Sequence, residues 1–373
     1  MGDKIVKNCL MLVTQNFENK IANGADVINK RNYKLLQENF DNVDILYCRR
    51  HINTNKSKLY SKFKNVIDLS ISDCKSEILT FLKTKVKNYN VIFIGQSSLG
   101  EFAEIIKKEN SEVLIITFFH NVELDYYWTQ CNLYRCYYLV YVLISWLNEK
   151  KAIRFSDKII TLNKRDSKRI YKLYGRSADL LLPTSFENKS LVFNENIINP
   201  NDLKLLFIGS NFYPNKQGII WFIRNVLDKL DNTVLEIIGR GTSEWLNESI
   251  FKHKKIKIYG EVENLDYYYI NADAVVIPIF IGGGMKTKTA EALMYGKHIF
   301  ATQEAFEGYD IDYNKVGALC NTAEEFINKI NLFSKSNYRK YNSYSREIFL
   351  KNYDEKINRK KFKNFIDERR TDK

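Results

Sequence analysis

Short apolar runs alternate with longer amphipathic stretches along almost the whole chain. The apolar runs are rich in β-branched and aromatic residues, which is typical of buried strands. The stretches between them carry apolar residues three and four positions apart, which predicts helices. Regular alternation of the two favours parallel sheets with helices on both faces. The predicted strands are residues 8–15, 43–48, 90–95, 112–119, 158–163, 203–209, 234–239, 256–260, 273–280 and 298–302, and the clearest helices are residues 25–40, 100–110, 218–230 and 263–272.

A polar segment rich in asparagine and serine interrupts this pattern near the middle of the chain, over residues 184–202. Such a composition is typical of a linker, and 373 residues suffice for two domains that each bury a core. We therefore predict two doubly wound α/β domains, over residues 1–183 and 203–350. Residues 351–373 have a polar, helical pattern that would pack against either domain or extend into solvent.

The chain carries a net charge of +13, and most of the excess lies in the N-terminal half. This favours an anionic partner, either a membrane surface or a phosphate-bearing substrate. A basic surface that only keeps the protein soluble explains the charge equally well. No stripe of lysine and arginine with interleaved aromatic residues stands out, which argues against nucleic acid as a partner.

The cysteines and histidines suggest neither a metal site nor a disulfide framework. Six cysteines and four histidines are scattered without the spacing of metal ligands, so reduced, structural cysteines are expected. The N-terminus lacks the apolar region of a secretory signal. The longest apolar run, residues 136–147, is shorter than the roughly 20 residues of a membrane-spanning helix. We therefore expect a cytoplasmic protein.

Residues 277–302, IPIFIGGGMKTKTAEALMYGKHIFAT, combine a strand end, a triple-glycine turn and a helix. Pro278 suits the end of the strand, Thr287 is the expected N-cap of the helix, and Gly296 is its expected stop. Glycines let the backbone approach a ligand closely, and the first N–H groups of a helix have no partners within it. A strand, a glycine turn and a helix N-terminus in this order predict a site for an anion.

Three charged side chains lie beside this turn. Lys286 and Lys288 would add cationic donors to an anion site. Glu291 follows Lys288 by three residues on the same helix face, and its carboxylate suits the two hydroxyl groups of a ribose. The segment therefore predicts a site for a diphosphate and a ribose. A glycine loop shaped only by packing, beside an ordinary Lys–Glu helix pair, is the alternative.

The stretch GGGMKTKTAEALMYGKHIFAT resembles the glycine, lysine and glutamate pattern of group-1 retaining glycosyltransferases with the GT-B fold. The resemblance extends through LLFIGSNFYPNKQGIIWF, EIIGRG and GEVENLDYYYINADAVVIPI, and it covers roughly residues 203–309. It implies the GT-B fold, in which two Rossmann-like doubly wound domains face a central cleft. It also implies that the C-terminal domain binds a nucleotide sugar as the donor substrate, with no separate cofactor.

The resemblance assigns roles to individual residues. The glutamate that matches Glu291 usually holds the nucleotide ribose, and the lysine that matches Lys216 commonly contacts the diphosphate. Two positions depart from the family, because many members have a glutamate at the position of Gly283 and an arginine at that of Ser210. A lysine beside the glycine turn would supply the missing positive charge. The residues predicted to bind the donor and its nucleotide are Gly209, Ser210, Lys216, Gly282, Gly283, Gly284, Met285, Lys286, Lys288 and Glu291.

A second set of candidates lies in the N-terminal half, in the segment FFHNVELDYY. His120, Asn121 and Glu123 follow a predicted strand and are suited to binding hydroxyl groups. The segment resembles the family's histidine loop, which lines the cleft opposite the donor, and Gly24 resembles a glycine near the acceptor. This implies catalytic positions for His120 and Glu123 and acceptor-side positions for Gly24 and Asn121. A structural histidine and a simple turn are the alternatives.

The sequence thus predicts a glycosyltransferase that moves a sugar from a UDP- or GDP-linked donor to an acceptor hydroxyl. The resemblance implies retention of anomeric configuration. Metal-independent transfer is expected, because no convincing Asp-x-Asp motif precedes the glycine turn. The acceptor would be a saccharide, a lipid-linked molecule or a glycoprotein. Assembly of a surface polysaccharide or glycoconjugate at the inner face of the cell membrane fits these features, with peripheral contact to an anionic membrane.

Two other functions are compatible with the same sequence. A nucleotide-sugar epimerase of similar fold would use the same site without an acceptor, although Gly283 removes one candidate acid or base. A catalytically silent GT-B subunit that binds a partner transferase would explain the departures at Gly283 and Ser210. Residues 136–147 are also open to two interpretations, as a surface for a lipid-linked acceptor or as a buried core helix.

Overall fold

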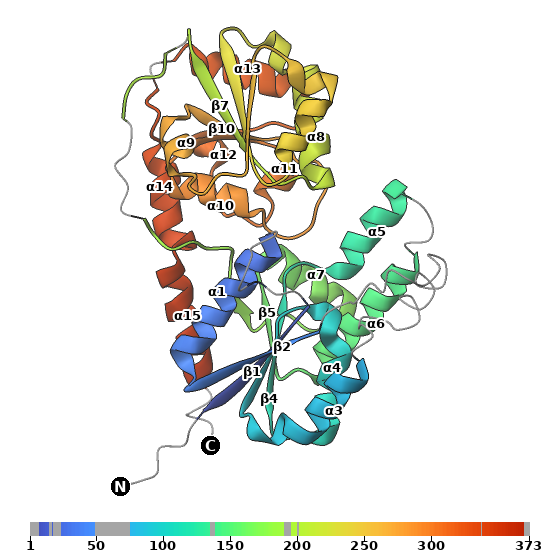
Figure 1. Cartoon of the computed structure of the whole chain (residues 1–373). Coiled ribbons are helices and arrows are strands. Elements are labelled where there is room, and N and C mark those ends of the chain that lie inside the picture. The colour runs from blue at the N-terminus through green and yellow to red at the C-terminus, as the bar shows by residue number, and fades with distance from the viewer. Residues whose placement is uncertain are drawn as a thin grey trace. The chain divides into compact units, whose positions relative to one another are not determined.

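The computed structural model describes residues 7–14, 17, 24–48, 75–134, 139–189, 195–199, 201–336 and 338–368. The chain divides into two compact units. The first, the N-terminal domain, ends at Leu182 and is completed by the chain from Arg359 onward, and the second, the C-terminal domain, runs from Pro183 to Asn358. Figure 1 shows each of them as a sheet with helices packed around it.

The N-terminal domain contains a parallel sheet in the order β2-β1-β3-β4-β5-β6. Its first five strands are the five predicted from the sequence, and β6 has only two residues, too few for a pattern. The strands are β1 Asn8–Val13, β2 Asn42–Tyr47, β3 Val91–Ile94, β4 Leu114–Phe119, β5 Lys158–Thr161 and β6 Leu180–Leu181. The helices are α1 Gly24–Asn39, α3 Lys75–Lys85, α4 Gly100–Glu109, α5 Glu123–Tyr134, α6 Leu139–Phe155, α7 Lys164–Tyr174 and most of α15 Glu355–Asp367.

The C-terminal domain contains a second parallel sheet, in the order β12-β11-β10-β7-β8-β9. Five of its strands were predicted, and the additional β12 is a short edge strand. The strands are β7 Leu203–Ile208, β8 Thr233–Ile238, β9 Ile256–Gly260, β10 Ala274–Ile277, β11 His298–Ala301 and β12 Gly317–Leu319. The helices are α8 Tyr213–Asn225, α9 Asp266–Asn271, α10 Thr287–Met294, α11 Gln303–Phe306, α12 Tyr313–Val316, α13 Ala323–Ser334 and α14 Ser343–Ile348. Two doubly wound α/β domains confirm the predicted fold class.

The strand order of the C-terminal domain contains a topological switch point. The chain runs from β7 outward through β8 and β9, and then crosses over to β10 on the other side of β7. In open parallel sheets ligands bind beyond the carboxyl ends of the strands at such a point. The carboxyl ends of β7 and β10 are therefore where a ligand is expected.

Helix α8 lies unusually close to the end of β10, because Gly218 has no side chain. A Cβ atom built on Gly218 would lie 1.9 Å from the carbonyl oxygen of Pro278, the residue that follows β10. The contact holds α8 against the strand that leads into the triple-glycine turn. It also explains why a glycine, a poor helix former, lies inside α8.

The C-terminal segment, which the sequence allowed to pack against either domain, packs against the N-terminal one. The ring of Phe362 on α15 lies 6.5 Å from that of Phe93 on β3, at an interplanar angle of 71°. Arg359 forms an ion pair with Glu38 of α1 at 3.0 Å. From Arg359 onward, the described part of the tail thus belongs to the core and surface of the N-terminal domain.

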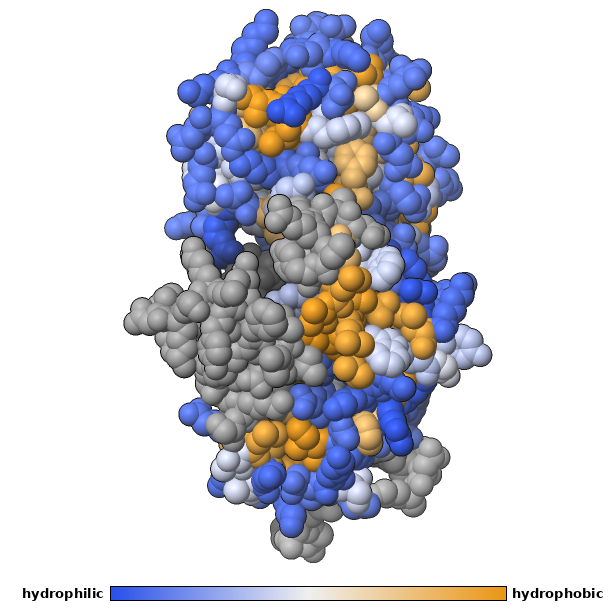
Figure 2. All heavy atoms as spheres, turned by 90° about the vertical axis from the view of Figure 1, so that its right-hand side faces the viewer, coloured by the Kyte–Doolittle hydropathy of each residue, from blue (hydrophilic) through white to orange (hydrophobic). Residues whose placement is uncertain are grey.

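Helices α5 and α6 expose apolar side chains on one face of the N-terminal domain, visible as an apolar patch in Figure 2. Trp128, Leu139 and Leu143 are 51%, 47% and 55% exposed. Further along α6, Ile144 and Ile153 are buried. The apolar segment at residues 136–147 is therefore partly a core helix and partly exposed, over the residues that can be described. None of the helices in the described ranges is long and apolar enough to cross a membrane.

Candidate functional site

The predicted donor-site residues gather at the carboxyl ends of β7 and β10. These strands are direct neighbours, with Ala274 opposite Leu205. Gly209 and Ser210 follow β7 immediately, and the glycine turn follows the end of β10. The structure thus places the two loops at the topological switch point. This point could not be located from the sequence, because the order of the strands in the sheet is not evident from it.

The glycine turn leads directly into α10. Gly284 has φ of +63°, in the left-handed region that favours glycine. The expected N-cap at Thr287 is wrong, because the backbone of Lys286 is still extended and Thr287 is the first helical residue. Gly296, with φ of +58°, follows the end of the helix as predicted. The first N–H groups of α10 therefore lie immediately after the turn.

Lys286 is bound into the turn that it follows. Its Nζ forms an ion pair with Glu304 at 2.6 Å and donates a hydrogen bond to the carbonyl oxygen of Gly284 at 2.9 Å. Glu304 lies in α11, after β11, and its Oε1 would be 3.3 Å from a Cβ atom on Gly282. A carboxylate is thus present at the turn although Gly283 has no side chain. Sequence reasoning missed Glu304, because only the strand order brings it to this place.

Lys288 connects α10 to the end of β7. Its Nζ donates a hydrogen bond to Oδ1 of Asn215 at 2.5 Å and lies 4.9 Å from the ring centroid of Phe207. Burial lowers the pKa of Lys288 to about 7; the charge of Lys286 adds to this effect, and that of Glu291 opposes it. An anion at this edge would restore the charged ammonium form.

Asn215 is a second residue that sequence reasoning missed. Besides accepting from Lys288, it donates from Nδ2 to the carbonyl oxygen of Ser210 at 3.0 Å. It therefore fixes the loop after β7 to Lys288 of α10. Asn215 is one of two asparagines in NFYPNKQG, and the sequence carries no signal of its role.

Glu291 lies on α10 and accepts a hydrogen bond at Oε2 from the hydroxyl of Tyr269, at 3.0 Å. Burial raises the pKa of Glu291 to about 7, while Tyr269, Lys189 and Lys288 act in the opposite direction. The ring of Tyr269 stacks on that of Tyr295, with centroids 4.2 Å apart and an interplanar angle of 7°. The carboxylate is thus held by one tyrosine, Tyr269, whose ring is fixed by stacking on Tyr295.

Lys216 lies in the first turn of α8 and forms an ion pair with Glu248. Its side chain is 31% exposed, so the ammonium group is accessible from solvent. Met285, in contrast, is only 5% exposed. Its position allows a backbone contribution to a ligand more readily than a side-chain one.

The other candidates lie in the N-terminal domain. Gly24 is the first residue of α1, and His120 and Asn121 follow β4 directly. Glu123 begins α5, and its backbone N–H donates to Oε1 of Glu149 at 2.7 Å. Glu149 is fully buried, and burial raises its pKa to about 8. This second carboxylate was not anticipated, since it lies within the apolar pattern of α6.

The imidazole of His120 is held in the neutral form. Burial lowers its pKa to about 3, the charge of Arg31 adds to the effect, and the backbone of Gly95 opposes it. Its ring lies edge-on to Phe118, with centroids 5.1 Å apart. A neutral imidazole can donate and accept hydrogen bonds, which suits the orientation of hydroxyl groups.

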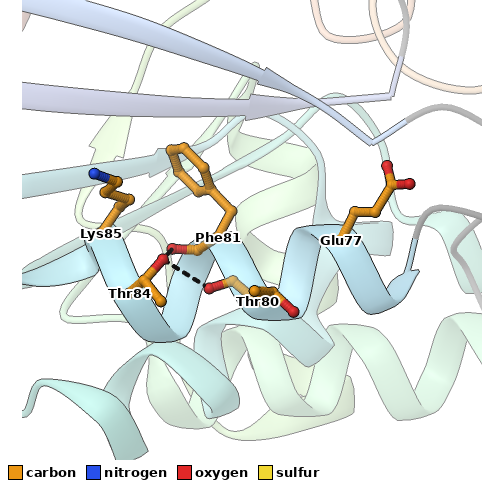
Figure 3. A pocket seen from close by; sticks show the side chains of 5 residues that line it. All are labelled: Glu77, Thr80, Phe81, Thr84 and Lys85. Atoms are coloured by element: carbon orange, nitrogen blue, oxygen red, sulfur yellow. Dashed lines mark hydrogen bonds between the residues drawn. The ribbon is translucent and has the colours of Figure 1, made fainter.

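Neither metal-ligating side chains nor the pocket of the N-terminal domain adds to the candidate site, among the described residues. Among the described residues, no group of three or more histidine, cysteine, aspartate or glutamate side chains could hold a metal ion. A pocket of the N-terminal domain lies along α3 (Figure 3), and its described lining residues all belong to that helix. The Thr84 hydroxyl there donates to the carbonyl oxygen of Thr80 at 2.9 Å. None of the predicted site residues lines this pocket.

Residues 202–335 match the family model described as "Glycosyl transferases group 1". No curated protein sequence matches the chain. Its fold is similar to that of Anabaena Alr3699/HepE in complex with UDP and glucose, with a TM-score of 0.66, 13% identity, and coverage of 97% of this chain and 100% of that one. It is also similar to the lipopolysaccharide outer core galactosyltransferase WaaB, with a TM-score of 0.58, 14% identity, and coverage of 97% and 98%. For TarM the TM-score is 0.66, with 11% identity and coverage of 96% and 98%.

The two parallel sheets and these similar structures show that the chain has the GT-B fold. Its C-terminal domain is a group 1 glycosyltransferase domain.

Proposed function

We propose that the protein transfers a sugar from a UDP- or GDP-linked donor to an acceptor hydroxyl, with retention of configuration and without a metal ion. This proposal rests on the arrangement of residues at the carboxyl ends of β7 and β10. There a glycine turn and a helix N-terminus meet the half-buried Lys288, and Glu291 lies along the same helix. Complexes of a protein with similar fold contain UDP or UDP-glucose, which supports a UDP-linked donor.

The diphosphate would be the leaving group of the reaction. The bond from the anomeric carbon to the diphosphate oxygen breaks, and a bond from that carbon to the acceptor oxygen forms. The acceptor proton passes to the departing phosphate. Backbone N–H groups of the glycine turn, with Lys216 and Lys288, would stabilise the negative charge that develops.

The N-terminal domain would supply the acceptor side. His120 and Glu123 would orient hydroxyl groups near the reacting carbon, with Asn121 and Gly24 beside the acceptor. The neutral state of His120 supports orientation rather than electrostatic attraction. The acceptor would be a saccharide, alone or carried by a lipid or a glycoprotein.

We place this reaction at the inner face of a cell membrane, in the assembly of a polysaccharide or glycoconjugate. The exposed apolar side chains on α5 and α6 support peripheral contact, with Lys150 of α6 nearby for anionic headgroups. Sedimentation with vesicles that contain anionic lipid should be stronger than with neutral vesicles. Equal, negligible sedimentation with both would remove the membrane from the proposal.

The donor screen is the first test of the function. Thermal-shift and calorimetric titrations should include UDP- and GDP-linked sugars, and each binder should then be offered acceptors while hydrolysis and transfer products are analysed. We expect one nucleotide sugar to bind and to be consumed. Conversion of the donor to an epimer would favour the epimerase, and binding without any turnover would favour the silent subunit.

Replacing Lys216 by alanine should weaken UDP binding by roughly 10- to 100-fold, because a charge-assisted contact to the diphosphate is lost. The affinity for UMP, which has no β-phosphate, should change little. Isothermal titration of both nucleotides gives this comparison. Arg224→Ala, which removes a positive charge from the last turn of the same helix, is the matched control. Equal losses for UDP and UMP would contradict a diphosphate contact.

Binding of UDP at pH 8 should be coupled to proton uptake. The pKa of Lys288 is lowered to about 7 in the free protein, so most of its amines are neutral at pH 8, and a diphosphate favours the ammonium form. Glu291, with a pKa of about 7, is already mostly ionised at that pH and contributes little. Affinity should therefore fall as the pH rises above 7. Calorimetry in two buffers of different ionisation enthalpy measures the uptake, which Lys288→Met should abolish.

A further inference from the structure

A lysine and an aspartate contact the tyrosine pair beside Glu291, and neither belongs to the loops after β7 and β10. Lys189 precedes β7 in the chain, and its Nζ lies 2.5 Å from Oδ1 of Asp266, the first residue of α9. Both groups bind the hydroxyl of Tyr295. Lys189 donates a hydrogen bond to it at 3.0 Å, and the hydroxyl donates to Oδ1 of Asp266. Each of the three polar groups is therefore bound to the other two.

Tyr295 connects this ion pair to Glu291. Its ring stacks on that of Tyr269, whose hydroxyl donates to the carboxylate of Glu291 at 3.0 Å. Both tyrosines are buried, with exposed fractions of 0% for Tyr269 and 1% for Tyr295. Neither ring can turn without disturbing the core around it. A short series of contacts thus leads from Lys189 and Asp266 through the two rings to the carboxylate.

The backbone of Lys189 is fixed to the helix that carries Glu291. Arg346 of α14 is only 8% exposed. Its Nη1 donates to the carbonyl oxygen of Met294, the last residue of α10, at 2.6 Å, and its Nη2 donates to that of Lys189 at 3.5 Å. Many exposed ion pairs contribute little, because two long side chains must be held in one geometry. Here the buried guanidinium holds the lysine backbone in place beforehand.

We infer that Lys189 and Asp266 are positioning residues for Glu291: through the stacked tyrosines and through their opposite charges, they govern how strongly its carboxylate holds the ribose hydroxyls. The inference rests on the proposed function, in which Glu291 binds the ribose. It deepens that function by adding two residues that act on Glu291 and not on the ligand.

The charges around Glu291 support this role. Burial raises the pKa of Glu291 to about 7, the hydrogen bond from Tyr269 and the charges of Lys189 and Lys288 lower it, and the charge of Asp266 raises it. Helix α14 also packs against α10, where Arg346 binds the carbonyl oxygen of Met294. Lys189 and Asp266 therefore act on Glu291 in opposite directions, although they belong to the same ion pair.

This opposition separates an electrostatic role from a merely structural one. Lys189→Met and Asp266→Asn both break the ion pair, so a structural role predicts the same change in both variants. The inference predicts opposite changes: the pKa of Glu291 should rise in Lys189→Met, which leaves the negative charge of Asp266 uncompensated, and fall in Asp266→Asn. Lys189→Arg keeps the positive charge and should behave as the wild type does.

The first measurement is an NMR titration of the protein without nucleotide, with glutamate labelled at the side-chain carboxyl carbon. The signal that is missing in Glu291→Gln belongs to Glu291. Its pH midpoint gives the pKa in the wild type and in each variant, and it does not depend on whether a ligand binds.

The second measurement compares UDP with its dideoxy analogue, which lacks both ribose hydroxyls. Both carry the diphosphate, so the ratio of the two affinities isolates the ribose contact from that of Lys288. About half of the Glu291 carboxyl groups are ionised at pH 7 in the wild type. At this pH the ratio should fall about threefold in Lys189→Met and rise by up to about twofold in Asp266→Asn. At pH 9 all variants should reach the wild-type ratio.

The inference is overturned if both variants move the midpoint of Glu291 in the same direction, or if neither moves it. If Lys189→Met does not fold, Asp266→Asn decides alone: a lowered midpoint supports the inference, and an unchanged or raised one overturns it. Equal affinity of the wild type for UDP and the dideoxy analogue, or no binding of UDP, counts against the proposed function instead. The titration without nucleotide would still decide whether Lys189 and Asp266 act on Glu291.

Discussion

Replacing Glu291 by alanine should reduce transfer at pH 8 by at least ~100-fold, mainly through the loss of donor binding. In the proposed site the carboxylate would accept hydrogen bonds from two ribose hydroxyls, and hydrogen bonds to a charged group contribute about 1.5–3 kcal/mol each. Two such bonds correspond to about 3 kcal/mol or more, or at least two factors of ten in affinity. Titration of UDP and a transfer assay at saturating acceptor measure the loss.

The folded state should tolerate this change. Burial raises the pKa of Glu291 to about 7, so the folded protein disfavours the ionised form and gains no stability from it at pH 8. The melting temperature should therefore change little. Tyr269→Phe is the companion variant, because it keeps the carboxylate and removes only the hydrogen bond of 3.0 Å. We expect a loss of about fivefold in UDP affinity for it. Full activity of Glu291→Ala would remove this residue from the site.

Replacing Gly218 by leucine should destabilise the C-terminal domain by about 3 kcal/mol or more. The new Cβ atom would lie 1.9 Å from the carbonyl oxygen of Pro278, a contact with rigid backbone that only a displacement of α8 can relieve. The displacement would separate Lys216 from the loops after β7 and β10. Urea denaturation and UDP titration should therefore show a parallel loss.

Gln217→Leu is the control for this prediction. Gln217 is exposed on the same helix, so its replacement changes the composition of α8 without a steric conflict. It should alter the free energy of unfolding by no more than about 0.5 kcal/mol. A variant with leucine at position 218 that is as stable as the wild type would contradict the close packing of α8 on β10.

The strands and the glycine turn before α10 could be predicted from the sequence because they depend on local patterns. Apolar runs of strand length gave ten of the strands, and GGGMKTKTAEALMYG gave the turn and the helix that carries Glu291. The two strands that were missed, β6 and β12, have two and three residues and carry no periodicity. The predicted N-cap, Thr287, is one residue too late. The N-cap is Lys286, which has an extended backbone and whose side chain does not cap the helix.

The partners of the charged residues could not be predicted in the same way. Glu304 binds Lys286, and Asn215 binds Lys288, only because β11, β10 and β7 are adjacent in the sheet. Strand order is a property of the whole domain, and no local pattern encodes it.

The central claim is that the carboxyl edge of β7 and β10 binds the nucleotide diphosphate of a sugar donor. A crystal structure of the protein grown with UDP tests it most directly. The account predicts the β-phosphate against the glycine turn at residues 282–284 and the N-terminus of α10, with the ribose hydroxyls on the carboxylate of Glu291. UDP bound at another place on the chain, or at this edge with its ribose turned away from Glu291, would contradict it.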